Sequence, residues 1–245
     1  MRTEIEKIHY AEIDSTSTEA GKLVRERGFV ERPILVSADR QNAGRGRQGK
    51  SFLSPEGGIY FTFAIPDAYI SGDYIGLTSF AALCVCESLE KFSSSVPKIK
   101  WVNDIYVDDR KVCGILTERL TDKNYKPLGV LIGIGINTRE FDLPPELQGT
   151  VGFVNIDDSQ KDKLVEDICL RLLTYGGSLA PYISEIRVKS CVIGRNITYF
   201  SNGVATDGKA LDITNDGGLL VSSCGRQVVL SSGELSLRFD GDARL

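Results

Sequence analysis

Histidine is the scarcest informative residue, because His9 is the only one among 245 residues. Sites that need two or more histidines, such as HExxH zinc sites and facial-triad iron sites, are therefore excluded. A Ser-His-Asp or Cys-His site would depend on His9 alone. Any chemistry that the chain performs is expected to use other groups.

The chain also lacks a CxxC pair and a long hydrophobic run. Half of its six cysteines lie in apolar stretches, and we expect buried, reduced thiols. The first residues lack the apolar core of a signal peptide. The longest apolar run, 128–136, is about half a bilayer span. These observations predict a cytoplasmic protein without a membrane partner.

An excess of positive charge is missing as well. The 29 basic and 33 acidic residues give a net charge of -4, which argues against nucleic-acid binding over the whole surface but allows a local basic patch. With 42% hydrophobic and 25% charged residues the composition is that of an ordinary globular protein. The length fits one large domain, or one large and one small.

Helical and strand patterns alternate through the first three quarters of the chain. Thr16 and Glu19 have the spacing of a capping box, and the helix that they open ends naturally at Gly28. The segment 39–51 has no periodicity and is expected to be a loop. Residues 128–136 are apolar on both faces, which predicts a central strand. Further strands are expected at 33–38, 58–65, 98–107 and 111–120, and helices at 74–92 and 161–179.

The pattern changes near residue 190. Short strands recur about every ten residues, separated by turn signals such as Asn215-Asp216-Gly217-Gly218. These strands are expected at 197–199, 210–213, 219–221, 228–230 and 235–239. The sequence thus predicts an α+β fold, in which a mixed β-sheet flanked by helices (residues 1–187) is followed by a small C-terminal β-barrel (188–245).

Three segments carry groups suited to anion chemistry. In the loop 39–51, four basic residues stand against one acidic residue, and glycines let the backbone approach an anion closely. No GK[ST] follows, so this is no Walker loop, and a solvated basic loop or an RNA-binding Arg-Gly tract remains an alternative. Lys111 begins a strand with buried neighbours, where a lysine needs a polar partner unless it points to solvent. In the third segment, Gly133 and Gly135 mark close packing before Asn137.

Taken together, these segments resemble the catalytic module of biotin protein ligases. The resemblance depends on Gly44-Arg45-Gly46-Arg47, on 100–104 (KWVND) with 110–116, and on 133–137 (GIGIN). Asp14-Ser15-Thr16 and 233–238 (GELSLR) match too, so the pattern spans about residues 9 to 239. In that family the biotin carboxylate attacks the α-phosphate of ATP, and a lysine of a biotin carboxyl carrier protein then attacks the biotinyl-5′-adenylate.

The resemblance also implies roles for individual residues. Lys111 would hold the biotin carboxyl oxygen and the α-phosphate, Arg45 and Arg47 would close over them, and Asp104 would sit near the carrier lysine. ATP and biotin would be substrates, Mg²⁺ would accompany ATP, and no protein metal site is expected. The residues implied for biotin are Ser15, Thr16, Ser17, Gln41, Arg45, Gly46, Arg47 and Lys111. Those implied for ATP and the adenylate are Arg45, Arg47, Asn103, Lys111, Gly133, Gly135, Ile136, Asn137 and Arg238.

The sequence departs from the family pattern at several positions. Val102 replaces a usual proline, Phe52 a usual tryptophan and Gln48 a frequent basic residue. Ser17 replaces a frequent asparagine, and a serine pair at 231–232 replaces a more glycine-rich stretch. None of these changes removes an expected cation. We therefore expect them to alter affinity or loop order and to leave the reaction type unchanged.

Partners follow from the same resemblance. Some members carry an N-terminal DNA-binding domain, but here the catalytic pattern begins within the first 15 residues, so no DNA binding by that route is expected. Exposed sheet edges leave a homodimer open. A lipoate-protein ligase is the nearest alternative function, although its Arg-Arg-x-Ser-Gly-Gly-Gly segment is absent. A non-catalytic RNA-binding or adaptor protein is a second alternative, but 39–51 lacks the aromatic residues that stack on bases.

Overall fold

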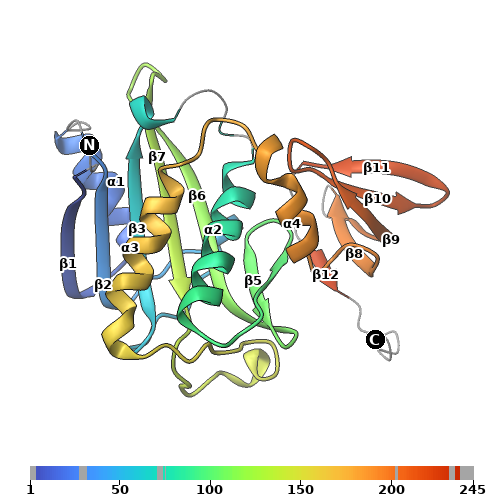
Figure 1. Ribbon diagram of the computed structural model, residues 1–245, viewed down its shortest axis with the longest axis horizontal. Helices are drawn as coiled ribbons and strands as arrows, with labels where there is room; N and C mark the ends of the chain where they lie inside the picture. Colours follow the sequence, from blue (N-terminus) through green and yellow to red (C-terminus); the bar gives the residue numbers. More distant parts are fainter. Residues whose placement is uncertain are drawn as a thin grey trace.

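The computed structural model describes residues 4–27, 32–70, 74, 76–201, 204–231 and 235–237. Within them the chain forms a seven-stranded sheet with helices on both faces and a second, antiparallel sheet (Figure 1). The strand order of the large sheet is β1-β2-β3-β7-β6-β5-β4. Its strands are β1 (Glu6–Ile13), β2 (Ile34–Gln41), β3 (Ile59–Pro66), β4 (Lys98–Lys100), β5 (Asp104–Val107), β6 (Arg110–Thr121) and β7 (Pro127–Ile136).

The large sheet is mixed, because β1 pairs with β2 in parallel, whereas the other pairs of neighbouring strands are antiparallel. β7 lies in the middle of the order, and its last eight residues are all buried. This confirms the central strand that its two apolar faces predicted. β7 is therefore fixed by hydrogen bonds on both sides, to β3 and β6.

Helices cover the two faces of this sheet unequally. α1 (Thr16–Arg27) packs Leu23 and Val24 on one face, against β2, β3 and β7. α2 (Leu77–Phe92) and α3 (Lys161–Leu172) cover the opposite face with the main core, and α4 (Ile183–Lys189) follows (Figure 1). The face that carries α1 is thus left partly open beside that helix, next to β7, β6 and β5.

Some expected local details differ in the structure. α1 is capped by Ser15, whose Oγ accepts from the amide of Thr18 at 3.4 Å, so the cap lies one residue before Thr16. The strand expected over 98–107 is two antiparallel strands, β4 and β5, joined by a turn at 101–103. That turn contains no Gly or Pro to signal it in the sequence. The Trp101–Val102 peptide bond within it is cis.

The C-terminal strands form an antiparallel sheet of order β11-β10-β9-β8-β12. In the part of the chain that the structure describes, β11 and β12 are its two edges, so this sheet is open where a barrel was expected. The expected boundary at 187–188 falls in the last turn of α4. The strands are β8 (Asn196–Ser201), β9 (Val204–Ile213), β10 (Leu219–Ser223), β11 (Arg226–Leu230) and β12 (Leu235–Leu237).

The small sheet shares one hydrophobic core with the large domain. Ile197, Ala210 and Val221 are fully buried in the same cluster as α2 and α4. The indole Nε1 of buried Trp101 donates to the Gly217 carbonyl at 2.8 Å, in the turn between β9 and β10. The two sheets are therefore joined by packing and by this buried hydrogen bond.

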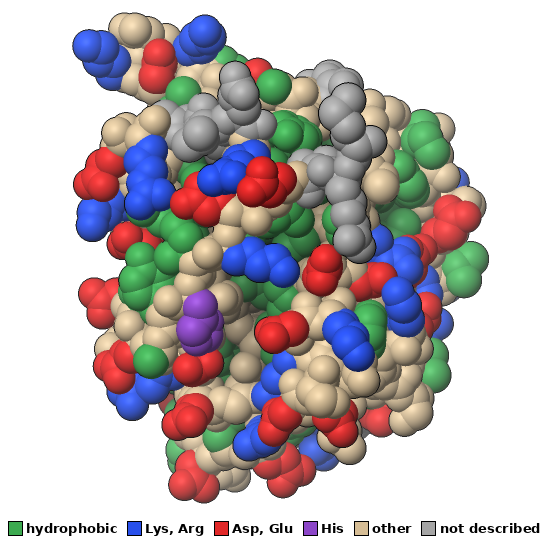
Figure 2. Space-filling model, turned by 60° about the vertical axis from the view of Figure 1, so that its left-hand side comes forward, with side chains coloured by type: hydrophobic (Ala, Val, Ile, Leu, Met, Phe, Trp, Pro, Cys, Tyr) green, Lys and Arg blue, Asp and Glu red, His purple; other side chains and the backbone are tan. Residues whose placement is uncertain are grey.

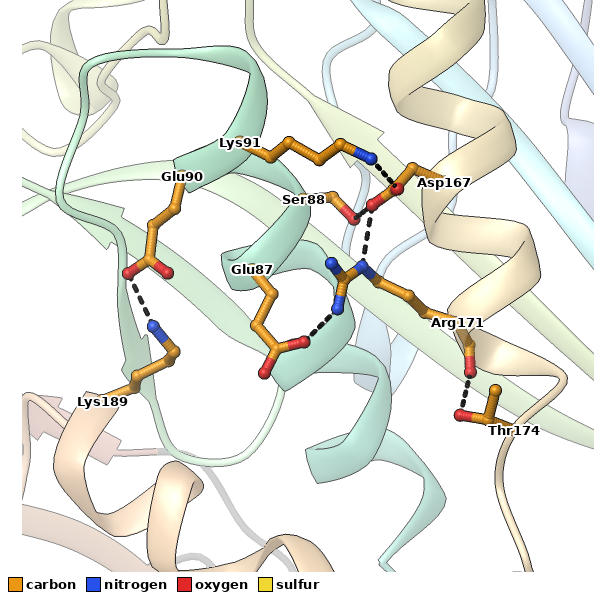
Figure 3. Close-up of polar contacts among 8 residues, drawn as sticks. All are labelled: Glu87, Ser88, Glu90, Lys91, Asp167, Arg171, Thr174 and Lys189. Atoms are coloured by element: carbon orange, nitrogen blue, oxygen red, sulfur yellow. Dashed lines mark hydrogen bonds and ion pairs between the residues drawn. The ribbon is translucent and has the colours of Figure 1, made fainter.

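Ion pairs connect the helices on the covered face (Figure 3). Asp167 on α3 accepts from Ser88 Oγ at 2.8 Å, Lys91 Nζ at 2.6 Å and Arg171 Nε at 2.7 Å. Burial alone raises the pKa of Asp167, but these donors outweigh it and lower the pKa to about 2. Lys189 on α4 pairs with Glu90 on α2 at 2.6 Å.

The molecular surface carries mixed charge. In the face shown in Figure 2, Lys and Arg side chains alternate with Asp and Glu, around the single histidine. His9 is exposed on edge strand β1, where its ring contacts Ser37 Oγ at 3.1 Å and Asp39 Oδ1 at 3.4 Å. Among the described helices none is long and apolar enough to cross a membrane.

Candidate functional site

A cavity of about 190 Å³ opens on the face of the large sheet that α1 covers only in part. The start of α1, the strands β5, β6 and β7, and the loop after β2 surround it. Among the described residues it is lined by Thr16, Ser17, Gln41, Arg45, Gly46, Arg47, Gln48, Lys50, Ser51, Phe52, Phe61, Lys100, Trp101, Asn103, Asp104, Lys111, Gly114, Ile115, Leu116, Gly133, Ile134 and Gly135. Most of the charged lining residues are cations.

Glycines on the central strands make room for the groups above them. Gly114 and Gly135 are paired across β6 and β7, and the ring of Phe52 lies over both. A Cβ on Gly135 would lie 2.4 Å from Phe52 Cε1. A Cβ on Gly133 would lie 2.6 Å from Ser17 Oγ. The close packing expected along this strand is therefore present, with Phe52 and Ser17 as the packed groups.

Hydroxyl and amide groups gather where α1 meets β2 and β3. The Oγ1 of Thr62, on an otherwise apolar strand, lies 2.9 Å from Thr16 Oγ1 and 3.0 Å from Ser17 Oγ. The Gln41 Oε1 accepts from the Thr16 amide at 2.9 Å, and Gln41 Nε2 donates to Ser54 Oγ at 2.8 Å. Because Thr16, Ser17 and Thr62 are buried, this end of the cavity offers fixed donors and acceptors of neutral charge.

Charged groups gather on the opposite side of β7. Lys111 Nζ lies 2.8 Å from Asp104 Oδ1, and Asn103 Nδ2 donates to the same oxygen at 3.0 Å. Arg47 donates to Asn103 Oδ1 at 3.0 Å. The lysine whose neighbours are buried thus has an anionic partner, and both groups are partly shielded from solvent.

Lys100 adds a further cation to this side. Its Nζ donates to the Tyr106 hydroxyl at 3.1 Å and lies 5.1 Å from the centre of that ring. Burial, with a smaller effect of Asp104, raises the pKa of Tyr106 to about 12. Tyr106 is therefore a neutral donor and acceptor at physiological pH, and it leaves the charge of Lys100 uncompensated.

The loop 42–53, called the flap below, folds over this cavity as a narrow hairpin. Phe52 N donates to the Gly44 carbonyl at 2.9 Å, and Gly46 N donates to the Lys50 carbonyl at 2.7 Å. The turn residues Gln48 and Gly49 have φ of 56° and 75°. A Cβ on Gly44 would lie 2.4 Å from the Phe52 carbonyl oxygen, so the hairpin requires glycine there.

Two arginine contacts tie the flap to the sheet. Arg45 donates through both terminal nitrogens to Glu118 on β6, at 2.6 and 3.1 Å, and Arg47 reaches Asn103. Glu118 is not among the cavity-lining residues of the described chain. The flap thus has one anchor outside the cavity and one inside it.

Most residues expected at the site line the cavity. Ser15 does not, because its hydroxyl caps α1, and Ile136 does not, because it is fully buried in the main core. Asn137 is buried beyond the cavity, where its Nδ2 donates to the Gly152 carbonyl at 3.3 Å and its Oδ1 has no partner. Arg238 lies outside the described residues. The expected residues that do line it are Thr16, Ser17, Gln41, Arg45, Gly46, Arg47, Asn103, Asp104, Lys111, Gly133 and Gly135.

Sequence reasoning missed several groups of this site, including four that make the contacts described above. Thr62 is a single polar residue in an apolar strand, which is a usable signal for a buried polar contact. Lys100 lies within a recognised segment and Phe52 next to one, but no spacing rule places them in the cavity. Glu118 is 73 residues away from Arg45 in sequence, so nothing local signals the pair.

The charged groups and the neutral polar groups thus lie at different ends of one cavity. β3 and β6 lie on either side of β7, so their groups are separated by two strand spacings, about 10 Å. A suitable ligand would present a neutral hydrogen-bonding group at one end and an anion at the other. No group of three or more metal-ligating side chains occurs among the described residues.

Comparisons with known proteins agree with this arrangement. A sequence model described as the "Biotin/lipoate A/B protein ligase family" matches residues 10–137. The "Bifunctional ligase/repressor BirA" of Escherichia coli is 31% identical over 211 residues, covering 82% of this chain and 65% of that protein. The match thus spans just under two thirds of that relative. The "Biotin--[acetyl-CoA-carboxylase] ligase" of Mycobacterium tuberculosis is 25% identical, covering 82% of this chain and 78% of that protein.

A solved structure extends the likeness over both sheets. The biotin protein ligase from Aquifex aeolicus, solved in complex with biotin and ATP, has a TM-score of 0.79 and 27% identity to this chain. The match covers 95% of this chain and 98% of that one.

Proposed function

This chain belongs to the biotin/lipoate A/B protein ligase family, and from that premise we propose that it activates biotin with ATP and transfers it to a lysine of a biotin carboxyl carrier protein. The observation that carries the proposal is the division of the cavity into a neutral hydroxyl end and a cationic end. The expected alternatives differ in what they would place at the hydroxyl end.

The hydroxyl end favours a ureido group. A urea has one carbonyl acceptor and two N–H donors, and the hydroxyls of Thr16 and Ser17 with the amide of Gln41 can both donate and accept. A dithiolane ring or an alkyl chain has no such groups, so it could not use the remaining hydrogen-bonding capacity of these buried atoms. This difference favours biotin over lipoate or octanoate.

The cationic end suits the first chemical step. A biotin carboxylate oxygen attacks the α-phosphorus of ATP, the bond to the β-phosphate breaks, and pyrophosphate leaves. Both reactants are anions, so fixed positive groups are needed to bring them together. In this proposal Lys111 binds the reacting oxygens, while Arg47 and Lys100 neutralise phosphate charge.

The second step uses the carboxylate of Asp104. The amine nitrogen of the carrier lysine attacks the acyl carbon, AMP leaves, and the amine must lose protons. Asp104 lies beside Lys111 at the cavity surface, so an incoming amine would meet a carboxylate already in a polar network. We assign it the role of general base or of orienting group for that amine.

Mg²⁺ enters as part of the ATP substrate. Its ligands are expected to be phosphate oxygens and water, because Mg²⁺ gives up water reluctantly and needs few protein groups. Asp104 is the one acidic side chain among the described residues that line the cavity. The cytoplasm is the proposed location, where thiols such as the six free cysteines stay reduced.

Biotin-dependent exchange of labelled pyrophosphate into ATP tests the proposal. We expect exchange with biotin, and none with lipoate or octanoate as the added acid. Thr62→Val, which keeps the volume but removes the hydroxyl, is expected to raise the Kd for biotin about tenfold. Exchange with lipoate or octanoate but not with biotin would refute the proposal and support the lipoate ligase alternative.

A further inference from the structure

Among the described residues, two of the cations that line the cavity are paired with carboxylates, Lys111 with Asp104 and Arg45 with Glu118. Arg45 uses both terminal nitrogens on the two oxygens of Glu118. Such a bidentate, charge-assisted pair is stronger than a single hydrogen bond at a similarly exposed site, and it fixes the orientation of the two side chains as well as their distance. Arg47 differs, because among the described residues it donates to the neutral amide oxygen of Asn103. The two arginines of the flap are therefore not equivalent.

We infer that Glu118 is a positioning residue, which holds the flap closed through Arg45, and that Arg47 is the flap arginine that meets the anionic substrate. This inference rests on the proposed function and deepens it. It separates two arginines that the sequence treats as a pair. It also adds to the reaction a residue that lies outside the cavity.

The electrostatics favour this division of roles. An incoming phosphate would have to displace a carboxylate from Arg45, and Glu118 would then be left half-buried without its partner, at a cost in desolvation. At Arg47 the same phosphate would displace a neutral carbonyl oxygen, which is the weaker acceptor. Phosphate therefore binds at Arg47 in preference to Arg45.

The geometry of the flap explains why a second anchor is useful. The hairpin is held at its base by the amide of Phe52 and near its tip by that of Gly46. Arg45 lies between them, paired as a β-bridge with Ser51. The contact of Arg45 with β6 therefore restrains the whole hairpin before any substrate binds. This restraint lowers the entropic cost of ordering the flap when it closes over the substrate.

Hydrogen exchange in the ligand-free protein tests the anchor. In Glu118→Gln one side chain is changed to a neutral one of the same size, and exchange at the amides of Gly46 and Phe52 is expected to become about 2- to 5-fold faster. Glu90→Gln is the matched control, since its pair with Lys189 is equally short but joins α2 to α4. Unchanged exchange in Glu118→Gln would overturn the inference.

A charge reversal tests the division of roles. Arg45→Glu alone and Glu118→Arg alone are each expected to release the adenylate several-fold faster, whereas the double variant Arg45→Glu/Glu118→Arg restores retention and slow exchange. Arg47→Glu is not expected to be restored by any change at Glu118. If the double variant retains the adenylate no better than Arg45→Ala, Arg45 contacts the anion and the inference is wrong.

These readouts separate the inference from the proposed function. The exchange experiment uses no substrate, so faster exchange in Glu118→Gln supports the anchor even if biotin is never activated. Normal biotin activation with unchanged exchange and unchanged retention would retain the proposed function and refute the anchor.

Discussion

Gly135→Ala is a small change with a large expected effect on the flap. The added Cβ would lie 2.4 Å from Phe52 Cε1 and 2.8 Å from Cζ. Carbon atoms in contact need about 3.5–4.0 Å, so one partner must move by about 1 Å or more. β7 is hydrogen-bonded on both sides and cannot shift, whereas Phe52 is half-buried on the flap. The ring, and the flap with it, is expected to move.

The size of the effect follows from the cost of overpacking. Inserting a methyl group into a filled site costs about 1–3 kcal/mol, which corresponds to a factor of about 5 to 150 in an equilibrium constant. Because the flap lies at the surface and can open, we expect this cost to fall on flap closure and not on global unfolding. Gly135→Ala should therefore release the adenylate about 5- to 150-fold faster, while the free energy of unfolding changes by less than about 1 kcal/mol.

Denaturant unfolding and single-turnover release of the adenylate are the two assays. Gly176→Ala is the matched control, because a Cβ there meets nothing within 4 Å. Phe52→Ala completes a double-mutant cycle, in which Gly135→Ala adds little once the ring is gone. Additive effects of the two changes, or normal release in Gly135→Ala, would show that the ring does not couple this strand to the flap.

Three further changes are expected to have separable effects. Lys111→Met keeps the aliphatic part of the side chain and removes the charge. In a single-turnover assay adenylate formation should fall by at least 100-fold, with the far-UV circular dichroism spectrum unchanged. Near-normal rates would make Lys111 a surface residue without a role in the reaction. Trp101→Phe leaves the buried Gly217 carbonyl unpaired and should lower the free energy of unfolding by about 1–3 kcal/mol in urea; a loss below about 0.5 kcal/mol would rule out a structural role for this bond. Asp167 has a lowered pKa, so its stabilisation is present above its unfolded value near 3.8 and is lost as pH falls toward about 2. Between pH 5 and 2 the free energy of unfolding of the wild type should fall by about 1–2 kcal/mol through this group, whereas Asp167→Asn should lack this stabilisation at every pH. Identical pH profiles of the two proteins would contradict the assignment.

The pattern of hydrophobic residues predicted much of the fold, and there are physical reasons for the elements that it did not predict. β7 was recognisable because its apolar residues cover both faces, and the mixed sheet flanked by helices is confirmed. β1 was not expected, since the exposed side of this edge strand is polar and only Ile8 and Tyr10 repeat on its inner side. The hairpin at 101–103 was missed because its turn contains no Gly or Pro, which are the strongest turn signals.

The candidate site was recognisable where its residues are close in sequence. The Arg-Gly segment and the strand that carries Lys111 both contribute to the cavity. The contacts of Glu118 and Thr62 were not predicted, because the order of the strands in the sheet brings these residues to their partners and spacing in the sequence does not. Sequence patterns thus identified the chemical groups, whereas pairing between strands decides which of them act together.

Direct detection of biotinyl-5′-adenylate tests the central claim most sharply. The purified chain is incubated with biotin and MgATP, the protein is separated from free nucleotide, and the retained small molecules are identified by mass spectrometry. One equivalent of biotinyl-5′-adenylate per chain is expected, with pyrophosphate released, and none in Lys111→Met. Retention of unreacted biotin and ATP by the wild-type chain, or release of ADP and phosphate in place of pyrophosphate, would contradict the claim that this cavity joins a carboxylate to the α-phosphate.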